Sequence, residues 1–168
     1  MRYLVLIIVV VLGAGGGVWL ANRGGEAPVA ASTQASEDAD IAAAMRALQI
    51  YLGRINAFDP AFADSYADNA VVHTTIHYGF GVTSGAVPAA ELKANASMLA
   101  DLQRQDRRQY HYSNLRASRI ERRVRIVGNL RIDSWRTPYT YRVDLMPDSD
   151  GVWKIVEEWT DTLATGMD

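Results

Sequence analysis

A chain of 168 residues is long enough for one domain, and 49% of its residues are hydrophobic while 21% are charged. This composition is typical of a globular protein. Cysteine is absent, which excludes disulfides, thiolate metal sites and thiol nucleophiles. The formal net charge is −2, and acidic and basic residues balance over the domain. A basic face for nucleic acid is therefore not expected.

The first residues are predicted to lie outside the fold. No charged residue occurs from Tyr3 to Asn22, and an arginine stands on each side of this run. As a helix the segment would be about 30 Å long, the thickness of a bilayer core. A cationic start before an apolar run is equally typical of a signal peptide. We expect residues 1–22 to be a signal peptide or a single-span membrane anchor, and the domain to be periplasmic or extracellular.

Three helices are predicted after this segment. Residues 23–36 are small and polar and indicate a flexible linker, so that the domain comprises residues 37–168. Ser36 is expected to cap the first helix. Its apolar residues recur at helical spacing and form one stripe, made of Ile41, Met45, Leu48, Leu52 and Ile55. Asp59-Pro60 predicts a short second helix through Tyr66.

A third helix is expected from Pro88 to about Leu102, because proline suits the first helical turn. Before it, Val71–Tyr78 predicts a strand and Gly79–Gly85 a loop. After it, alternating residues predict four more strands joined by short turns, at 110–120, 124–135, 139–146 and 152–162. This order predicts an α+β fold, a curved antiparallel sheet wrapped over three N-terminal helices as a cone-shaped α+β barrel. One N-terminal apolar helix would precede it.

Two histidines lie four residues apart on the first predicted strand, His73 and His77. On a strand their Cα atoms would be about 13 Å apart, too far for both rings to reach one metal ion. The following glycines have the spacing G-x-G-x-x-x-G, which matches neither a dinucleotide loop nor a P-loop. Neither a metal nor a nucleotide cofactor is expected.

Alternation on this strand assigns its residues to two faces. Ala70, Val72, Thr74 and Ile76 share one face, and the histidines share the other. The apolar face is expected to pack against the helices. Val72 and the polar Thr74 would then lie on the inner side of the sheet, where a small-molecule ligand would contact them.

Two stretches resemble the nuclear transport factor 2-like superfamily: "FDPAFADSYADNAVVH" after an amphipathic helix, and "DGVWKIVEEWTD" at the end of the meander. The resemblance covers roughly Asp40 to Thr162. It implies a cone with a cavity at its wide end, and often a homodimer formed through the outer sheet face. The superfamily contains ketosteroid isomerases, limonene-epoxide-hydrolase-like enzymes, SnoaL-like polyketide cyclases, dehydratases and non-catalytic binding proteins, so the fold alone does not fix the chemistry.

The resemblance also suggests site residues. Tyr51 is similar in position to the oxyanion-binding tyrosine of the ketosteroid isomerases, and Thr74 stands where they have a base aspartate. A threonine hydroxyl is too weak a base to replace that carboxylate. The epoxide hydrolases have an Arg-x-Asp and a later aspartate that resemble Arg131-Ile132-Asp133 and Trp159-Thr160-Asp161. Two carboxylates beside an arginine would supply a general acid and a general base.

The alternation of side chains along each strand predicts which of these candidates face the cavity. Trp153, Ile155, Glu157, Trp159 and Asp161 share a mainly apolar face, which is expected to be the inner one. Asp161 and Trp159 would then face the cavity. Arg131 and Asp133 share the less apolar face of their own strand, and such a pair also occurs as an exposed ion pair.

These observations lead to two hypotheses. In the first, an exported domain binds a small, mostly apolar molecule in its cone. The sequence does not decide whether it also performs acid–base chemistry of the lyase, isomerase or hydrolase type. Asp161 would be the acid–base group, supported by Arg131 and Asp133, while Tyr51 and Thr74 position the ligand. In the second, the chain is a non-catalytic, membrane-tethered assembly or interaction domain that uses the outer sheet face.

Overall fold

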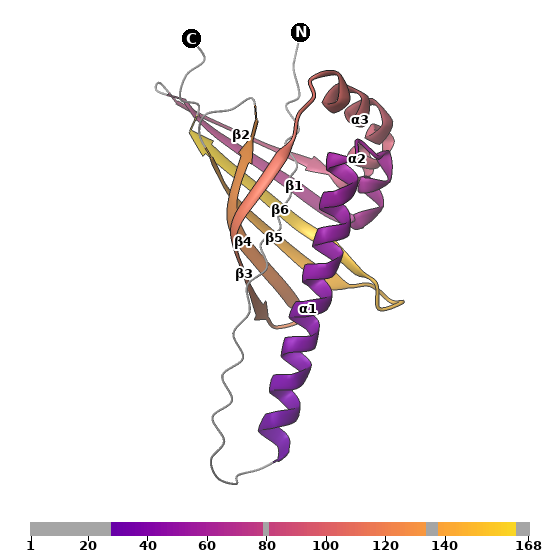
Figure 1. Ribbon diagram of the computed structural model, residues 1–168, viewed down its shortest axis with the longest axis vertical. Helices are drawn as coiled ribbons and strands as arrows, with labels where there is room; N and C mark the ends of the chain where they lie inside the picture. Colours follow the sequence, from indigo (N-terminus) through magenta and orange to yellow (C-terminus); the bar gives the residue numbers. More distant parts are fainter. Residues whose placement is uncertain (1–27, 79–80, 134–137, 164–168) are drawn as a thin grey trace.

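The computed structural model describes residues 28–78, 81–133 and 138–163 and has the expected α+β architecture, with helices packed on one sheet (Figure 1). The elements in chain order are α1 (Pro28–Asn56), the 3₁₀ helix η1 (Pro60–Ser65), β1 (Tyr66–Tyr78), β2 (Gly81–Pro88), α2 (Ala89–Ala94), α3 (Ala96–Gln105), β3 (Tyr110–Ile120), β4 (Arg123–Ile132), β5 (Tyr139–Pro147) and β6 (Trp153–Leu163).

The six strands form one open sheet in the order β2-β1-β6-β5-β4-β3. From β3 to β6 each strand is antiparallel to the next, as the short turns predicted. β1 joins this meander beside β6 and runs parallel to it, while β2 is antiparallel to β1. The sheet is therefore mixed, and β2 and β3 are its edges.

β2 corrects the prediction of a loop at Gly79–Gly85. From Gly81 onward the chain pairs with β1 as an antiparallel strand. Its side chains are exposed almost throughout. An edge strand with neither face buried carries no apolar alternation, which is the pattern by which a strand is found in a sequence. The glycines and other small residues of this segment are instead typical of a loop.

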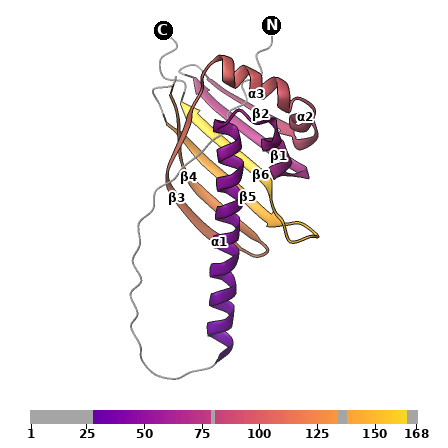
Figure 2. The ribbon, with the colours of Figure 1, turned by 45° about the vertical axis from the view of Figure 1, so that its right-hand side comes forward.

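α1 begins at Pro28 and not at Ser36, so the latter part of the expected linker is helical. The segment before Ser36 is rich in alanine, the strongest helix former, and proline is compatible with the first helical position. The first turns of α1 extend past the sheet in both views (Figures 1 and 2). Residues 1–22 lie outside the described residues. Among the residues that the structure does describe, no helix is long and apolar enough to cross a membrane.

The predicted third helix is divided into α2 and α3 at Asn95. The Asn95 side-chain amide donates to the carbonyl of Glu91 at 2.9 Å. The Asn95 backbone N–H also donates to that carbonyl. Asparagine side chains compete with regular helical hydrogen bonds in this way, and the chain changes direction here.

α1 covers one face of the sheet, which we call the inner face (Figure 2). The predicted stripe of α1 is confirmed, because Leu48, Leu52 and Ile55 are fully buried. Each fully buried leucine or isoleucine contributes about 1.5–3 kcal/mol. The inner face meets them with apolar residues from four strands, namely Ala70, Val72, Val124, Ile126, Leu130, Ile132, Val143 and Ile155.

Candidate functional site

An extra residue in β6 decides which of its side chains face inward. Leu145 of β5 lies opposite Ile155, but the preceding Asp144 lies opposite Glu157. Val156 is therefore unpaired, as in a β-bulge, and the alternation of β6 changes phase there. Before the bulge Ile155 is buried, and after it Glu158 and Thr160 are buried. The bulge thus places a carboxylate on the inner face.

Glu158 lies among tyrosine hydroxyl groups. Tyr66 donates a hydrogen bond to the Glu158 carboxylate. Tyr51 of α1 donates to Glu158 Oε2 at 3.1 Å, and the hydroxyls of Tyr51 and Tyr66 also contact each other. Glu158, Tyr51 and Tyr66 are each at most 1% exposed. Residues from α1, β1 and β6 therefore meet in one buried polar group.

Two more tyrosines complete this group. Tyr112 of β3 and Tyr141 of β5 pack edge to face, with ring centroids 4.7 Å apart. Both rings are buried. The Tyr141 hydroxyl interacts with the Glu158 carboxylate, whereas the Tyr112 hydroxyl has no hydrogen-bond partner among the described residues. The Glu158 charge acts on both hydroxyls. We call Tyr51, Tyr66, Tyr112, Tyr141 and Glu158 the tyrosine–glutamate cluster.

The environment of Glu158 changes its acidity. Burial raises the pKa of Glu158 from its usual 4.5 to about 7. The hydrogen bonds donated by Tyr66 and Tyr51 limit this rise, because they favour the charged form. Burial, and next the Glu158 charge, raises the pKa of both tyrosines well above 10. Near neutral pH the tyrosines are therefore neutral hydrogen-bond donors, and Glu158 exists in both protonation states.

Val72 and Thr74 extend the site along β1. Val72 is buried and pairs with Glu158 across the two parallel strands. Thr160 donates a hydrogen bond to the Thr74 hydroxyl at 3.3 Å. β1 thus has the phase that its alternation predicted, and the sequence candidates Tyr51, Val72 and Thr74 lie in or beside the cluster.

No protein-family model matches the sequence, and no curated protein matches it. Solved structures do match. A candidate dehydratase of the NTF2-like family from Streptomyces avermitilis is 14% identical with a TM-score of 0.55, over 77% of this chain and 99% of that one. An NTF2-like protein from Novosphingobium aromaticivorans is 11% identical with a TM-score of 0.53, over 83% and 90%.

The chain has the nuclear transport factor 2-like fold. A chain of naphthalene 1,2-dioxygenase, solved with indole in the active site, also shares it, with 13% identity and a TM-score of 0.56 over 81% of this chain and 88% of that one. The resemblance proposed from the sequence is thereby confirmed at the level of fold. At such low identity the chemistry must be argued from the side chains.

The predicted inward orientation of Asp161 in this NTF2-like fold is wrong. Its side chain is 55% exposed and pairs with His77 at 3.0 Å. Trp159 likewise points to the outer face, where its ring stacks on His73 with centroids 5.3 Å apart. Both predictions continued the alternation of Ile155 without the bulge at Val156, and the bulge reverses the faces of every later residue.

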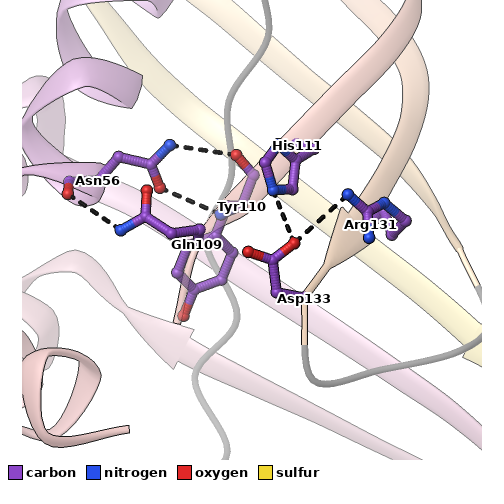
Figure 3. A network of polar contacts seen from close by, with 6 residues as sticks. All are labelled: Asn56, Gln109, Tyr110, His111, Arg131 and Asp133. Atoms are coloured by element: carbon purple, nitrogen blue, oxygen red, sulfur yellow. Dashed lines mark hydrogen bonds and ion pairs between the residues drawn. The ribbon is translucent and has the colours of Figure 1, made fainter. Parts of the chain in front are cut away.

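Arg131 and Asp133 lie together at an exposed position (Figure 3). Asp133 accepts from Arg131 at 3.3 Å and contacts His111 Nε2 at 2.8 Å. Each of the three side chains is about half exposed. In the same view, Asn56 at the end of α1 exchanges hydrogen bonds with the backbone of Tyr110. The contacts of Asn56 fasten α1 to β3. The ion pairs of Arg131 and Asp133 involve each other and His111, and no residue of the tyrosine–glutamate cluster.

A second buried carboxylate, Asp144, shows what Glu158 lacks. Asp144 is 1% exposed and receives two hydrogen bonds from the Arg125 guanidinium, at 2.8 and 2.7 Å. Arg123 lies 3.9 Å from it. Glu158 has no ion pair with any described residue. Asp144 is a compensated structural charge, whereas the Glu158 charge is held by hydroxyl groups alone.

Metal-ion chemistry has no candidate among the described residues, because no three His, Asp or Glu side chains cluster there.

Two pockets lined by described residues open away from the tyrosine–glutamate cluster. One of about 450 Å³ lies beside Asn69, Arg123 and Glu157. The other, of about 480 Å³, lies outside α1.

The stretch "EEW" contains the sequence signal for Glu158. Choosing the second glutamate over the first requires knowledge of the bulge at Val156.

Proposed function

We propose that this NTF2-like domain binds a small, mostly apolar molecule against the tyrosine–glutamate cluster, with Glu158 as its proton-transfer group. The observation that carries the proposal is a fully buried carboxylate without a cationic partner among the described residues. An uncompensated buried charge opposes folding. A strongly perturbed carboxyl group of this kind is typical of a functional site.

The unpaired Tyr112 hydroxyl indicates the kind of ligand. Nearly all buried polar groups in proteins have a hydrogen-bond partner. The Tyr112 hydroxyl therefore favours a partner beyond the described residues, such as a carbonyl or hydroxyl oxygen of a ligand. The surrounding residues are apolar or aromatic. The preferred ligand is thus a neutral molecule with an apolar body and at least one oxygen function.

The acidity of Glu158 favours proton transfer. A pKa of about 7 lets one carboxyl group act as a base and then as an acid near neutral pH. The carboxylate would remove a proton from carbon next to a carbonyl group. The resulting acid would return that proton to another carbon, as in an isomerase, or to a departing hydroxyl that leaves as water, as in a lyase. The candidate dehydratase that shares the fold is consistent with the second reaction.

Hydrolase chemistry is not part of the proposed function. Its expected residues were Arg131, Asp133 and Asp161, and all three side chains are exposed. Desolvation is what separates the pKa values of catalytic carboxyl groups from those of ordinary ones. Glu158 is the carboxylate that burial perturbs in this way.

A neutral aromatic alcohol, 2-naphthol, tests the proposal by fluorescence titration of the full chain. We expect saturable binding that Glu158→Gln alters in its dependence on pH between 5.5 and 8.5. Glu157→Gln is the matched control, because Glu157 is the neighbouring residue and its side chain lies on the other face and is partly exposed. Equal pH dependence in wild type and both variants, or no saturable binding, would contradict the proposal.

A second candidate is the non-catalytic interaction domain. It is supported by the outer face, where the Arg142 guanidinium lies 3.4 Å from the Trp159 ring centroid and His73 stacks on the same ring. An aromatic group beside an arginine is typical of protein interfaces. In this proposal the face forms a homodimer, and Trp159→Glu gives a monomer in light scattering. A monomeric wild type would exclude it.

We also propose export, on the strength of the apolar run in residues 1–22. N-terminal sequencing of the mature protein distinguishes the two forms. A cleaved signal peptide gives a new N-terminus after the run, and a membrane anchor leaves the chain intact in the membrane fraction. A full-length chain in the soluble cytoplasmic fraction would contradict export.

A further inference from the structure

A hollow lies on the outer side of α1, away from the tyrosine–glutamate cluster. It has a volume of about 480 Å³ and lies between α1, the end of η1 and the first residues of β6. We call it the α1 groove. Its apolar lining includes Ile50, Val152 and Trp153, and its basic lining consists of Arg46, Arg54 and Lys154.

The groove exposes apolar surface. Ile50 is 59% exposed and Val152 is 52% exposed, although both are large hydrophobic residues. Trp153 is partly buried and packs against the core beneath them. Single exposed apolar residues are common on protein surfaces, but neighbouring ones that line one hollow indicate a binding surface.

The basic residues of the groove have no ion-pair partner in the part of the chain that the structure describes. Arg54 donates to the carbonyl of Ala61 at 2.8 Å, and Lys154 donates to the carbonyl of Asp64 at 2.7 Å. These bonds fix both side chains without neutralising them. Arg46, Arg54 and Lys154 form no ion pair with any described residue. The Asp64 side chain is the one acid in the lining, so the groove carries a net positive charge.

We propose that the α1 groove binds a small amphiphilic carboxylate, with its alkyl or aromatic body on Ile50, Val152 and Trp153 and its head group at the arginines. Charge complementarity selects an anion, and fixed donors require little further ordering when it binds. The volume lies within the range of small-molecule sites.

The two sites would select different molecules. The cluster offers hydroxyl groups and a carboxyl group whose pKa is about 7, so above that pH it repels an anion. The groove offers two positive charges held by backbone hydrogen bonds, a third from Arg46, and an open apolar surface. At pH 8 a carboxylate would therefore bind the groove and not the cluster.

Decanoate is the probe, titrated as a monomer into the full chain at pH 8 by calorimetry. We expect one saturable site, and a chemical-shift change at the indole N–H of Trp153. Arg46→Glu should weaken binding about tenfold or more, which corresponds to about 1.4 kcal/mol. Ile50→Ser should weaken it independently. Arg122→Glu, a charge reversal of an exposed arginine in the β3–β4 turn, is the matched control and should leave binding unchanged.

Four results would overturn the proposal. Decanoate that causes no shift at Trp153 does not occupy the groove. Equal weakening by Arg46→Glu and Arg122→Glu would indicate general attraction by net charge. Binding that Glu158→Gln changes more than Arg46→Glu would place decanoate in the cluster. Equally tight binding of decyltrimethylammonium would also contradict the selection of an anion.

Discussion

The Tyr66 hydroxyl donates a hydrogen bond to the Glu158 carboxylate, joining the first residue of β1 to the middle of β6. The pairing of the two strands shifts register between Tyr66 and Val71, and Val156 forms a bulge in β6. These irregularities turn both side chains toward α1. The contact between Tyr66 and Glu158, on which the proposed function rests, therefore depends on these interruptions of the regular strand alternation.

Tyr66→Phe should raise the pKa of Glu158 above 7. The lost hydrogen bond stabilises the charged carboxylate, and it is the largest influence that lowers this pKa. Tyr51→Phe should act in the same direction with a smaller effect. The measurement is a ¹³C NMR titration of the glutamate side-chain carboxyl. An unchanged or lower pKa in Tyr66→Phe would contradict this contact.

Glu158 should make the protein less stable as the pH rises from about 4.5 to about 7. Over this range the carboxyl is ionised in the unfolded chain but still protonated in the fold, so the folded state binds more protons. The stability lost is about 3 kcal/mol, and it stays lost at higher pH. Glu158→Gln should remove this loss, whereas Glu157→Gln should retain it. Urea denaturation at a series of pH values provides the test.

Arg125→Leu should destabilise the fold by about 3 kcal/mol, because it leaves the buried Asp144 carboxylate without its bidentate partner. Arg123, at 3.9 Å from Asp144, would compensate only in part. Replacing both Arg125 and Asp144 by leucine should recover most of the loss. A double variant as unstable as the single one, measured by urea denaturation, would show that the ion pair is not the cause.

Gly128→Ala should destabilise the protein by about 1–3 kcal/mol. A Cβ at this position would lie 2.6 Å from Leu115 Cδ2 and 2.9 Å from the Ser113 carbonyl oxygen. The register shift of β3 brings its chain close to β4 here. Gly53→Ala is the control, because nothing lies within 4 Å of its Cβ position and alanine favours a helix. Thermal unfolding that ranks the two variants in the opposite order would contradict this packing.

The sequence predicted the features that depend on regular periodicity. The stripe of α1, the four-stranded meander and the inward face of Val72 all follow from spacing and are confirmed. β2 escaped prediction because an exposed edge strand has no apolar pattern. The early start of α1 at Pro28 depends on alanine propensity, which a search for apolar periodicity does not detect.

The site was predicted in part, for a related reason. Tyr51 lies on a helix, and Val72 and Thr74 lie in the part of β1 that pairs regularly with β6 after the register shift; all three are at or beside the cluster. Asp161 and Trp159 follow the bulge at Val156, so their predicted faces are reversed. A bulge adds one residue without a characteristic sequence, and one residue is enough to exchange the two faces of a strand.

Glu158 is proposed to be a buried carboxyl group that transfers a proton near neutral pH. Its ¹³C NMR titration in the wild-type chain, assigned by comparison with Glu158→Gln, tests this most directly. We expect a midpoint of about 7 that moves when 2-naphthol is bound. A midpoint near the usual 4.5, unaffected by 2-naphthol, would show a solvated carboxylate and contradict the proposed function.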